Sequence, residues 1–207
     1  MERLVKVWQV GKISYANGLK LQKQLANLHT RDKHLNDTLL CVEHPPVYTI
    51  GIRTNLYDEA EEMKGGLITF HGPGQLVIYP ILNLKHFKPS IKWYVCRIEK
   101  TVINLCTKFG LVAETSPHTG VWIGDNKVCA IGIHGSRFIT THGFALNCNN
   151  DLTWFDHIVP CGLKLNRIVT IDEVLPKLLD SFSDVFECTF INYPKERADE
   201  LWKNIDR

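Results

Sequence analysis

Cys161 is the residue whose type and setting best suit covalent chemistry. Most free cysteines are small core hydrophobes, and that interpretation covers most of the seven cysteines in this chain. Cys161 differs because Pro160 and Gly162 bracket it in a predicted turn, where a side chain can face a cleft. A nearby cation in such a turn favours the thiolate, which is the nucleophilic form of cysteine. Cys161 is therefore the candidate nucleophile.

Two further residues could carry protons. Lys127 stands at the start of an apolar run, where a lysine most often extends its ammonium group to solvent. It becomes a useful proton donor and acceptor only if burial or a partner acts on its ammonium group. His142, next to Gly143, is ambiguous in the same way, because most such histidines are structural. The residues alone therefore leave both the structural and the proton-carrying interpretation open for Lys127, and His142 is an accessory candidate.

A glycine-rich stretch from Lys64 to Gln75 could hold a ligand. Its four glycines and one proline flank a short predicted strand at Leu67–Phe70. Glycines let a backbone approach a ligand closely, but they also form ordinary tight turns, and composition does not choose between these interpretations. The stretch is not a P-loop, because the pattern G-x-x-x-x-G-K-S/T is absent here and elsewhere. ATP use therefore has no local support.

A zinc site is the alternative use of these side chains. Its ligands would be His142, Cys148, His157 and Cys161. Their spacing does not give the closely spaced ligand pairs of common structural zinc sites. We therefore expect no metal.

The composition excludes several classes of protein. The chain has 207 residues, of which 44% are hydrophobic, with 24 Lys and Arg against 22 Asp and Glu. This balance is typical of a folded protein. A net charge of +2 is too small for the phosphate neutralisation that non-specific nucleic-acid binding requires. No apolar run reaches the roughly 18 to 20 residues that span a bilayer. Seven cysteines without a C-x-x-C pair indicate a reducing compartment.

Strand and helix patterns are intermixed along the chain without a repeat. Apolar runs predict strands at Leu4–Val10, Thr38–Glu43, Val47–Ile50, Leu67–Phe70, Gln75–Ile81, Gly120–Ile123, Val128–Ile133, Arg137–Thr140 and Phe144–Cys148. Ser90 can cap a helix whose apolar residues recur from Ile91 to Phe109 and which ends at Gly110. Further helices are predicted at Tyr15–Leu28, Asp172–Phe186 and Lys195–Ile205. Adjacent strands with separately grouped helices favour an α+β fold, in one domain over residues 1–207.

Charge is uneven along the chain. Residues 1–31 hold six basic residues and one acid, whereas the residues from Asp172 onward hold nine acids and five bases. The basic segment is either part of a mitochondrial presequence or the edge of the folded domain. The strand and helix predicted there favour the folded interpretation. Such a basic face could dock an acidic partner.

Four segments together resemble the lipoyl(octanoyl) transferases. They are HPPVYTIG from His44, KGGLITFHGPGQL from Lys64, TGVWIGDNKVCAIGI from Thr119 and THGFALNCNNDLTWFDHIVPCGL from Thr141. The resemblance covers roughly residues 1–175, and the stretch from Thr119 to Leu163 is most similar to the eukaryotic, mitochondrial branch. It implies an α+β fold with a mixed or antiparallel sheet and flanking helices, as in the catalytic domains of lipoate ligases and biotin protein ligases.

The resemblance implies acyl transfer. Octanoate would move from octanoyl-acyl carrier protein, where it is held on a 4′-phosphopantetheine arm, to a lysine of an apo lipoyl domain. Such acceptors are the glycine cleavage H protein and the E2 subunits of 2-oxoacid dehydrogenases. The family implies no cofactor of the enzyme's own. The location would be the mitochondrial matrix in a eukaryote, and the cytoplasm otherwise.

Carried over by position, the resemblance makes Cys161 the acyl-thioester nucleophile and Lys127 its proton-carrying partner. Backbone N–H groups near Cys161 or the side chain of His71 would stabilise the oxyanion. Lys64 stands where the family usually has arginine, so the charge is kept but the planar donor fork is lost. The predicted pocket is lined by Lys64, Gly65, Gly66, Leu67, Ile68, Thr69, Phe70, His71, Ala130, Ile131, Gly132, Gly143, Phe144 and Ala145.

Other activities on the same residues stay open. A lipoate-protein ligase would use an adenylate, and a lipoyl amidotransferase would take lipoyl from a protein donor. A Cys/His thioesterase would form the acyl adduct and lose it to water, whereas a lipoate-binding scaffold would form none. The Pro-Cys-Gly turn at Cys161 counts against an adenylating ligase.

Overall fold

The main sheet of the protein is mixed and antiparallel for the most part. The computed structural model describes residues 3–31, 37–50, 68–157 and 169–205. Within them the sheet has the strand order β10-β1-β2-β5-β9-β8-β7-β6, in which only the pairs of β1 with β2 and with β10 are parallel. Its strands are β1 (Leu4–Lys12), β2 (Asp37–Glu43), β5 (Gln75–Ile81), β6 (Glu114–Thr115), β7 (Val121–Ile123), β8 (Asn126–Ser136), β9 (Ile139–Asn147) and β10 (Thr189–Asn192). A separate antiparallel pair joins β3 (Val47–Ile50) to β4 (Ile68–His71).

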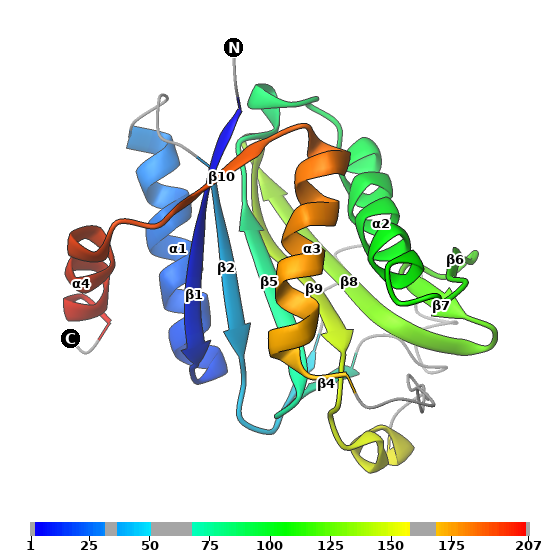
Figure 1. Ribbon diagram of the computed structural model, residues 1–207. Coiled ribbons are helices and arrows are strands. Elements are labelled where there is room, and N and C mark those ends of the chain that lie inside the picture. Colours follow the sequence, from blue (N-terminus) through cyan, green and yellow to red (C-terminus); the bar gives the residue numbers. More distant parts are fainter. Residues whose placement is uncertain (1–2, 32–36, 51–67, 158–168, 206–207) are drawn as a thin grey trace, which may run out of the picture.

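Helices cover both faces of the main sheet (Figure 1). The helices α2 (Ile91–Thr107) and α3 (Ile171–Phe186) pack against each other and bury one core with the sheet. The helices α1 (Tyr15–Arg31) and α4 (Lys195–Lys203) bury a second core on the opposite face. Alternation along β5 explains the two cores, because Leu76 and Ile78 enter the first and Val77 and Tyr79 enter the second. This arrangement confirms the predicted α+β fold with flanking helices.

Local sequence signals account for the two helices of the first core. The side chain of Ser90 accepts a hydrogen bond from the Trp93 amide at 3.2 Å, as predicted for the helix cap. The helix α2 ends at Thr107, slightly before the predicted end at Gly110. The helix α3 begins with a reciprocal capping box between Thr170 and Glu173. None of the helices in the described part of the chain has the length and apolar content needed to cross a membrane.

The strand prediction was wrong at the β8–β9 hairpin. We predicted separate strands at Arg137–Thr140 and Phe144–Cys148, but one strand, β9, runs from Ile139 to Asn147. Arg137 and Phe138 form the two-residue turn before it, with φ of 51° and 69°. Both values lie in the left-handed region that type I′ turns require and that Gly or Asn usually occupies. The Arg-Phe pair therefore carries no sequence signal for this turn.

The strands β5 and β9 approach each other closely at Gly143. A Cβ atom on Gly143 would lie 2.0 Å from the carbonyl oxygen of Ile78 and 2.7 Å from Cδ of Pro80. Gly132 stands opposite Gly143 in the β8–β9 register, and a Cβ atom there would meet no atom within 4 Å. The two glycines therefore have different structural roles although they form one pair.

We expect Gly143→Ala to destabilise the protein by about 1 to 3 kcal/mol, because its methyl group must displace the backbone of β5. The matched variant Gly132→Ala adds the same methyl group to open space and should change the free energy of unfolding by less than about 0.5 kcal/mol. Urea unfolding of both variants measures the difference. Equal stability of the two variants would contradict the close approach at Gly143.

Candidate active site

The structure describes part of the predicted site. Cys161 and the pocket residues Lys64, Gly65, Gly66 and Leu67 lie outside the described residues. The roles predicted for them therefore stay predictions. Within the described ranges, no three His, Cys, Asp or Glu side chains come together as a group that could hold a metal ion. The zinc alternative includes Cys161 and so falls outside this test.

The two predicted pocket segments on β8 and β9 are brought together in register. Ala130 pairs with Ala145, Ile131 with Phe144, and Gly132 with Gly143. Because side chains alternate along a strand, these pairs face different sides of the sheet. Ile131 and Phe144 belong to the α2–α3 core, whereas Ala145 belongs to the core under α1. Small side chains on the α1 face are therefore supplied by the pair Ala130 and Ala145.

Lys127 lies at the start of β8, one residue after the turn that joins β7 to it. It pairs with Trp122 in register, and its Nζ lies 4.9 Å from the centroid of the Trp122 ring. This cation–π contact orients the ammonium group without neutralising it. None of the salt bridges between described residues includes Lys127. Its charge is therefore not balanced by a described carboxylate.

Gly120 makes room for the stem of Lys127. A Cβ atom on Gly120 would lie 3.3 Å from Cδ and Cε of Lys127 and 2.6 Å from the Cys129 carbonyl oxygen. The φ of Gly120 is +131°, a value that side chains with a Cβ atom rarely adopt. The TGVW segment at the start of β7 therefore has a physical link to the candidate proton carrier.

His71, at the end of β4, is the predicted pocket residue with the most defined hydrogen bonding. Its Nδ1 lies 2.7 Å from Oε1 of Gln75. The amide nitrogen of Gln75 donates to the Phe70 carbonyl oxygen at 3.2 Å and to Oδ1 of Asn147 at 2.9 Å. Gln75 thereby joins β4, β5 and β9 at one point.

A second histidine lies beside His71. The ring centroids of His44 and His71 are 5.9 Å apart, and Tyr15 stacks on His71 at the same centroid distance. His44 Nδ1 donates to the Ile13 carbonyl oxygen, and its Nε2 lies 2.7 Å from the Tyr79 hydroxyl. Sequence reasoning gave no role to several members of this group. We call Tyr15, His44, His71, Gln75 and Tyr79 the histidine cluster.

Two members of the histidine cluster, Gln75 and Tyr79, could have been found from the sequence. Gln75 and Tyr79 are polar residues in the buried strand β5, and both occupy its α1-facing positions. Buried polar side chains on one face of an apolar strand require partners, so they indicate a hydrogen-bonded site. Tyr15 and His44 carry no comparable signal, because only the fold brings them to β5.

The histidine cluster is uncharged at neutral pH. Burial lowers the pKa of His71 to about 4, and it also lowers the pKa of His44. Burial raises the pKa of both Tyr15 and Tyr79. The accessory candidate His142 has a pKa lowered by burial, and its backbone N–H donates to Oε1 of Gln22 on α1. The histidine cluster is thus neutral, whereas the other described candidate, Lys127, contributes a basic side chain.

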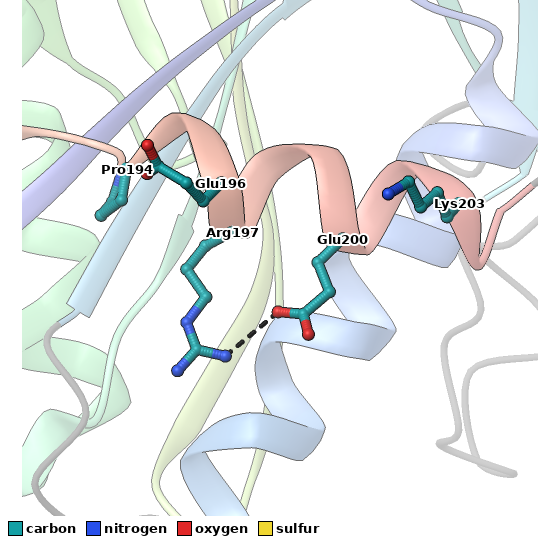
Figure 2. Close-up of a pocket in the computed structure, with 5 residues that line it drawn as sticks. All are labelled: Pro194, Glu196, Arg197, Glu200 and Lys203. Carbon is teal, nitrogen blue, oxygen red and sulfur yellow. Dashed lines mark hydrogen bonds and ion pairs between the residues drawn. The ribbon is translucent and has the colours of Figure 1, made fainter.

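An open depression of about 670 Å³ lies elsewhere, along α4 (Figure 2). It is lined by Pro194, Glu196, Arg197, Glu200 and Lys203. The ion pair between Arg197 and Glu200, 3.1 Å long, joins two exposed side chains and contributes little. The helix α4 follows the edge strand β10, whereas Lys127 lies near the opposite edge of the sheet. This depression shares no residue with the candidate active site.

The low pKa of His71 predicts acid sensitivity. A histidine whose pKa is lowered on folding binds fewer protons in the native state, so stability falls as pH drops from about 6.5 towards 4. Between pH 7 and pH 5 we expect His71 to account for about 2 kcal/mol of lost stability. Urea unfolding at both pH values measures the effect. In His71→Gln the decrease in the free energy of unfolding from pH 7 to pH 5 should be smaller by about 2 kcal/mol than in the wild type. An unchanged loss would contradict the burial of a neutral His71, and the exposed His118→Gln serves as the control.

Comparison with known proteins places the chain in a family. Residues 14–191 match the family described as lipoyl protein ligase A/B catalytic domain. The chain is 53% identical to the mitochondrial octanoyl-acyl-carrier-protein:protein N-octanoyltransferase LIPT2 of Danio rerio, over 89% of this chain and 93% of that protein. The human protein of the same name is 38% identical, over 91% and 96%. The octanoyltransferase of Caldanaerobacter subterraneus subsp. tengcongensis is 40% identical, over 89% and 91%.

Solved structures share the fold at low identity. A lipoate-protein ligase A bound with ATP superimposes with a TM-score of 0.74 and 16% identity, over 100% of this chain and 95% of that chain. The biotin protein ligase of Aquifex aeolicus, in complex with biotin and ATP, gives a TM-score of 0.57 and 15% identity, over 89% and 71%. These likenesses confirm the fold that the sequence resemblance implied. With its match over residues 14–191 and its octanoyltransferase relatives, this chain belongs to the family of lipoyl protein ligase A/B catalytic domains.

Proposed function

We propose that this chain transfers an octanoyl group from octanoyl-acyl carrier protein to a lysine of a lipoyl domain, through a thioester on Cys161. The acyltransferase activity rests on one observation, which is 38 to 53% identity to proteins named as octanoyltransferases, over most of both chains. This reaction is the first step in making protein-bound lipoate. The remaining steps follow from the chemistry of the chain's own residues.

In the first half-reaction the Cys161 thiolate attacks the thioester carbonyl of the donor. A cysteine with an ordinary pKa near 8.5 is only a few per cent ionised at neutral pH, so a nearby cation raises the reactive fraction. We assign this role to Lys127 by its position in the family motif, and its Nζ has no ion-pair partner among the described residues. The new C–S bond to Cys161 forms as the C–S bond to pantetheine breaks, and the proton from Cys161 passes to the leaving thiolate.

In the second half-reaction the acceptor lysine attacks the acyl-enzyme as a free amine. The N–C bond forms, the C–S bond to Cys161 breaks, and one proton moves from the amine to the sulfur. Lys127 carries that proton. The step is downhill because a thioester becomes an amide.

We propose that the acyl chain lies on the α1 face of the sheet. Ala130 and Ala145 pair there across β8 and β9. A Cβ atom on the neighbouring Gly132 would meet no atom within 4 Å. Burial of the methylenes of an octanoyl chain contributes about 0.8 kcal/mol for each carbon. We propose these small residues as one wall of the acyl site.

The acceptors we propose are apo lipoyl domains, namely the glycine cleavage H protein and the E2 subunits of 2-oxoacid dehydrogenases. The mitochondrial names of the relatives from Danio rerio and Homo sapiens support a mitochondrial location, and we propose the matrix. We propose that the exposed Lys23 on α1 contacts the acidic carrier protein. Lys20 is less available to a partner, because its Nζ already donates a hydrogen bond to the Ile205 carbonyl oxygen at 2.8 Å.

A lipoate-protein ligase activity is the second candidate. Its support is the shared fold with a lipoate-protein ligase A that was solved bound with ATP. An adenylating ligase would require ATP and would leave no acyl group on cysteine. A thioesterase would form the cysteine adduct but lose it to water without an acceptor.

We expect intact-mass analysis to show one octanoyl increment after mixing with octanoyl-acyl carrier protein, and peptide mapping to place it on Cys161. Apo lipoyl domain should then remove the increment and gain it on lysine, without ATP. Cys161→Ser should abolish the increment, whereas Cys96→Ser, which replaces an exposed cysteine on α2, should keep it. An ATP requirement or loss of the adduct only to water would overturn the transferase proposal.

We expect Lys127→Met to slow acyl-enzyme formation by about 10² to 10⁴-fold at pH 7, because the thiolate loses its cation and its proton carrier. Raising the pH towards 9 should restore part of the rate, since hydroxide then ionises Cys161 directly. Rapid-quench mass spectrometry measures the rate. The exposed Lys100→Met on α2 is the control, and a Lys127→Met rate equal to wild type would contradict the role.

A further inference from the structure

The hydrogen bonds of Gln75 fix which nitrogen of His71 carries the proton. The Gln75 amide nitrogen faces the Phe70 carbonyl oxygen at 3.2 Å and Oδ1 of Asn147 at 2.9 Å, and a carbonyl can only accept. Oε1 of Gln75 is therefore the atom that faces His71, and it too can only accept. Nδ1 of His71 must donate to it, so Nδ1 bears the hydrogen.

A neutral His71 in this tautomer has an unprotonated Nε2. No hydrogen bond from another described residue reaches Nε2, although the ring edge is not sealed, since His71 keeps 8% of its surface exposed. His44 differs, because both of its ring nitrogens are used, one by the Ile13 carbonyl oxygen and one by the Tyr79 hydroxyl. Of the two imidazoles in the histidine cluster, His71 alone offers a hydrogen-bond acceptor to a ligand.

We propose that Gln75 is a positioning residue that holds His71 with Nε2 free, and that this Nε2 accepts a hydrogen bond from the amine of the incoming lysine. The inference rests on the proposed function and assigns a residue to its second half-reaction. It departs from the oxyanion role that the sequence analysis allowed for His71. A nitrogen without hydrogen cannot donate to an oxyanion.

The surroundings of His71 suit a neutral amine and not an ammonium ion. The rings of Tyr15 from α1 and His44 after β2 contact it, His142 from β9 acts on its pKa, and all three stay uncharged at neutral pH. Of the described groups that act on the His71 pKa, none is a carboxylate or a lysine. Among the described residues, a charged ammonium beside His71 would thus be desolvated without a counter-ion, which favours the free base.

The proton balance leaves His71 unchanged over the cycle. As the N–C bond forms, the nitrogen becomes positively charged, and its N–H donates more strongly to Nε2. The C–S bond then breaks, and the proton passes through Lys127 to the Cys161 sulfur. His71 orients the amine lone pair towards the carbonyl carbon and stabilises the developing charge, but it takes no proton at the end.

The tautomer can be measured on the wild-type protein. Long-range ¹H–¹⁵N correlation spectra distinguish a protonated from an unprotonated ring nitrogen, and His71→Gln assigns the His71 signals by their absence. We expect Nδ1 protonated and Nε2 unprotonated at pH 7. In Gln75→Leu, which removes the acceptor, the signals should move towards the other tautomer. A wild-type His71 with its proton on Nε2 would overturn the proposal without any kinetic measurement.

The two half-reactions separate this inference from the proposed function. His71→Gln and Gln75→Leu should slow the transfer of octanoyl from Cys161 to apo lipoyl domain by about tenfold or more beyond any slowing of the loading of Cys161. Gln9→Leu, at an exposed glutamine on β1, should change neither rate. Equal slowing of both half-reactions, or no slowing of transfer, would overturn the role of His71. Absence of any acyl-enzyme in the wild type would instead overturn the proposed function.

Discussion

The site depends on the hydrogen bonds made by one buried side chain, that of Gln75. Gln75 is the first residue of β5, and its amide reaches β4 through Phe70 and His71 and β9 through Asn147. Its donors and acceptor are all used, which is what burial of an amide requires. The strand pair β3–β4 is not part of the main sheet, and this amide links His71 directly to β5 and β9. We therefore expect a substitution at Gln75 to change the orientation of the His71 ring more than it changes the main sheet.

Electrostatics divides the candidate site into two parts. The histidine cluster is buried and uncharged, and its histidines have lowered pKa values because burial disfavours their cationic forms. The Nζ of Lys127 lies over the face of Trp122, and its stem lies beside the space that Gly120 leaves open. Acyl transfer to an amine needs both environments. The cation favours a thiolate, and the neutral cluster favours a deprotonated amine.

Much of the fold was predictable because its signals are local. The Ser90 cap, the spacing of apolar residues in α2, and the apolar runs of β2 and β5 each depend on neighbouring residues. The β8–β9 hairpin was not, because Arg137 and Phe138 adopt a positive φ only under the pairing of the two strands. The short strand β10 was also missed, since its pairing with β1 joins the two ends of the chain. Long-range pairing leaves no trace in a window of neighbouring residues.

The candidate site, like the fold, was predictable only where neighbouring residues carry the signal. The family resemblance implied that Ala130–Gly132 and Gly143–Ala145 line one pocket; their register places them side by side on β8 and β9, and the pocket itself stays a prediction. The tautomer of His71 and the contact of His44 with Tyr79 could not be predicted, since both depend on side chains from separate strands.

A crystal structure of the octanoyl-enzyme would test the central claim most directly. We predict electron density for a thioester on Cys161, with its sulfur within about 4 Å of Lys127 Nζ, a loose hydrogen-bond distance. The acyl chain should lie on the α1 face against Ala130 and Ala145. An acyl group on another cysteine, or a chain buried on the α2–α3 face, would contradict the account.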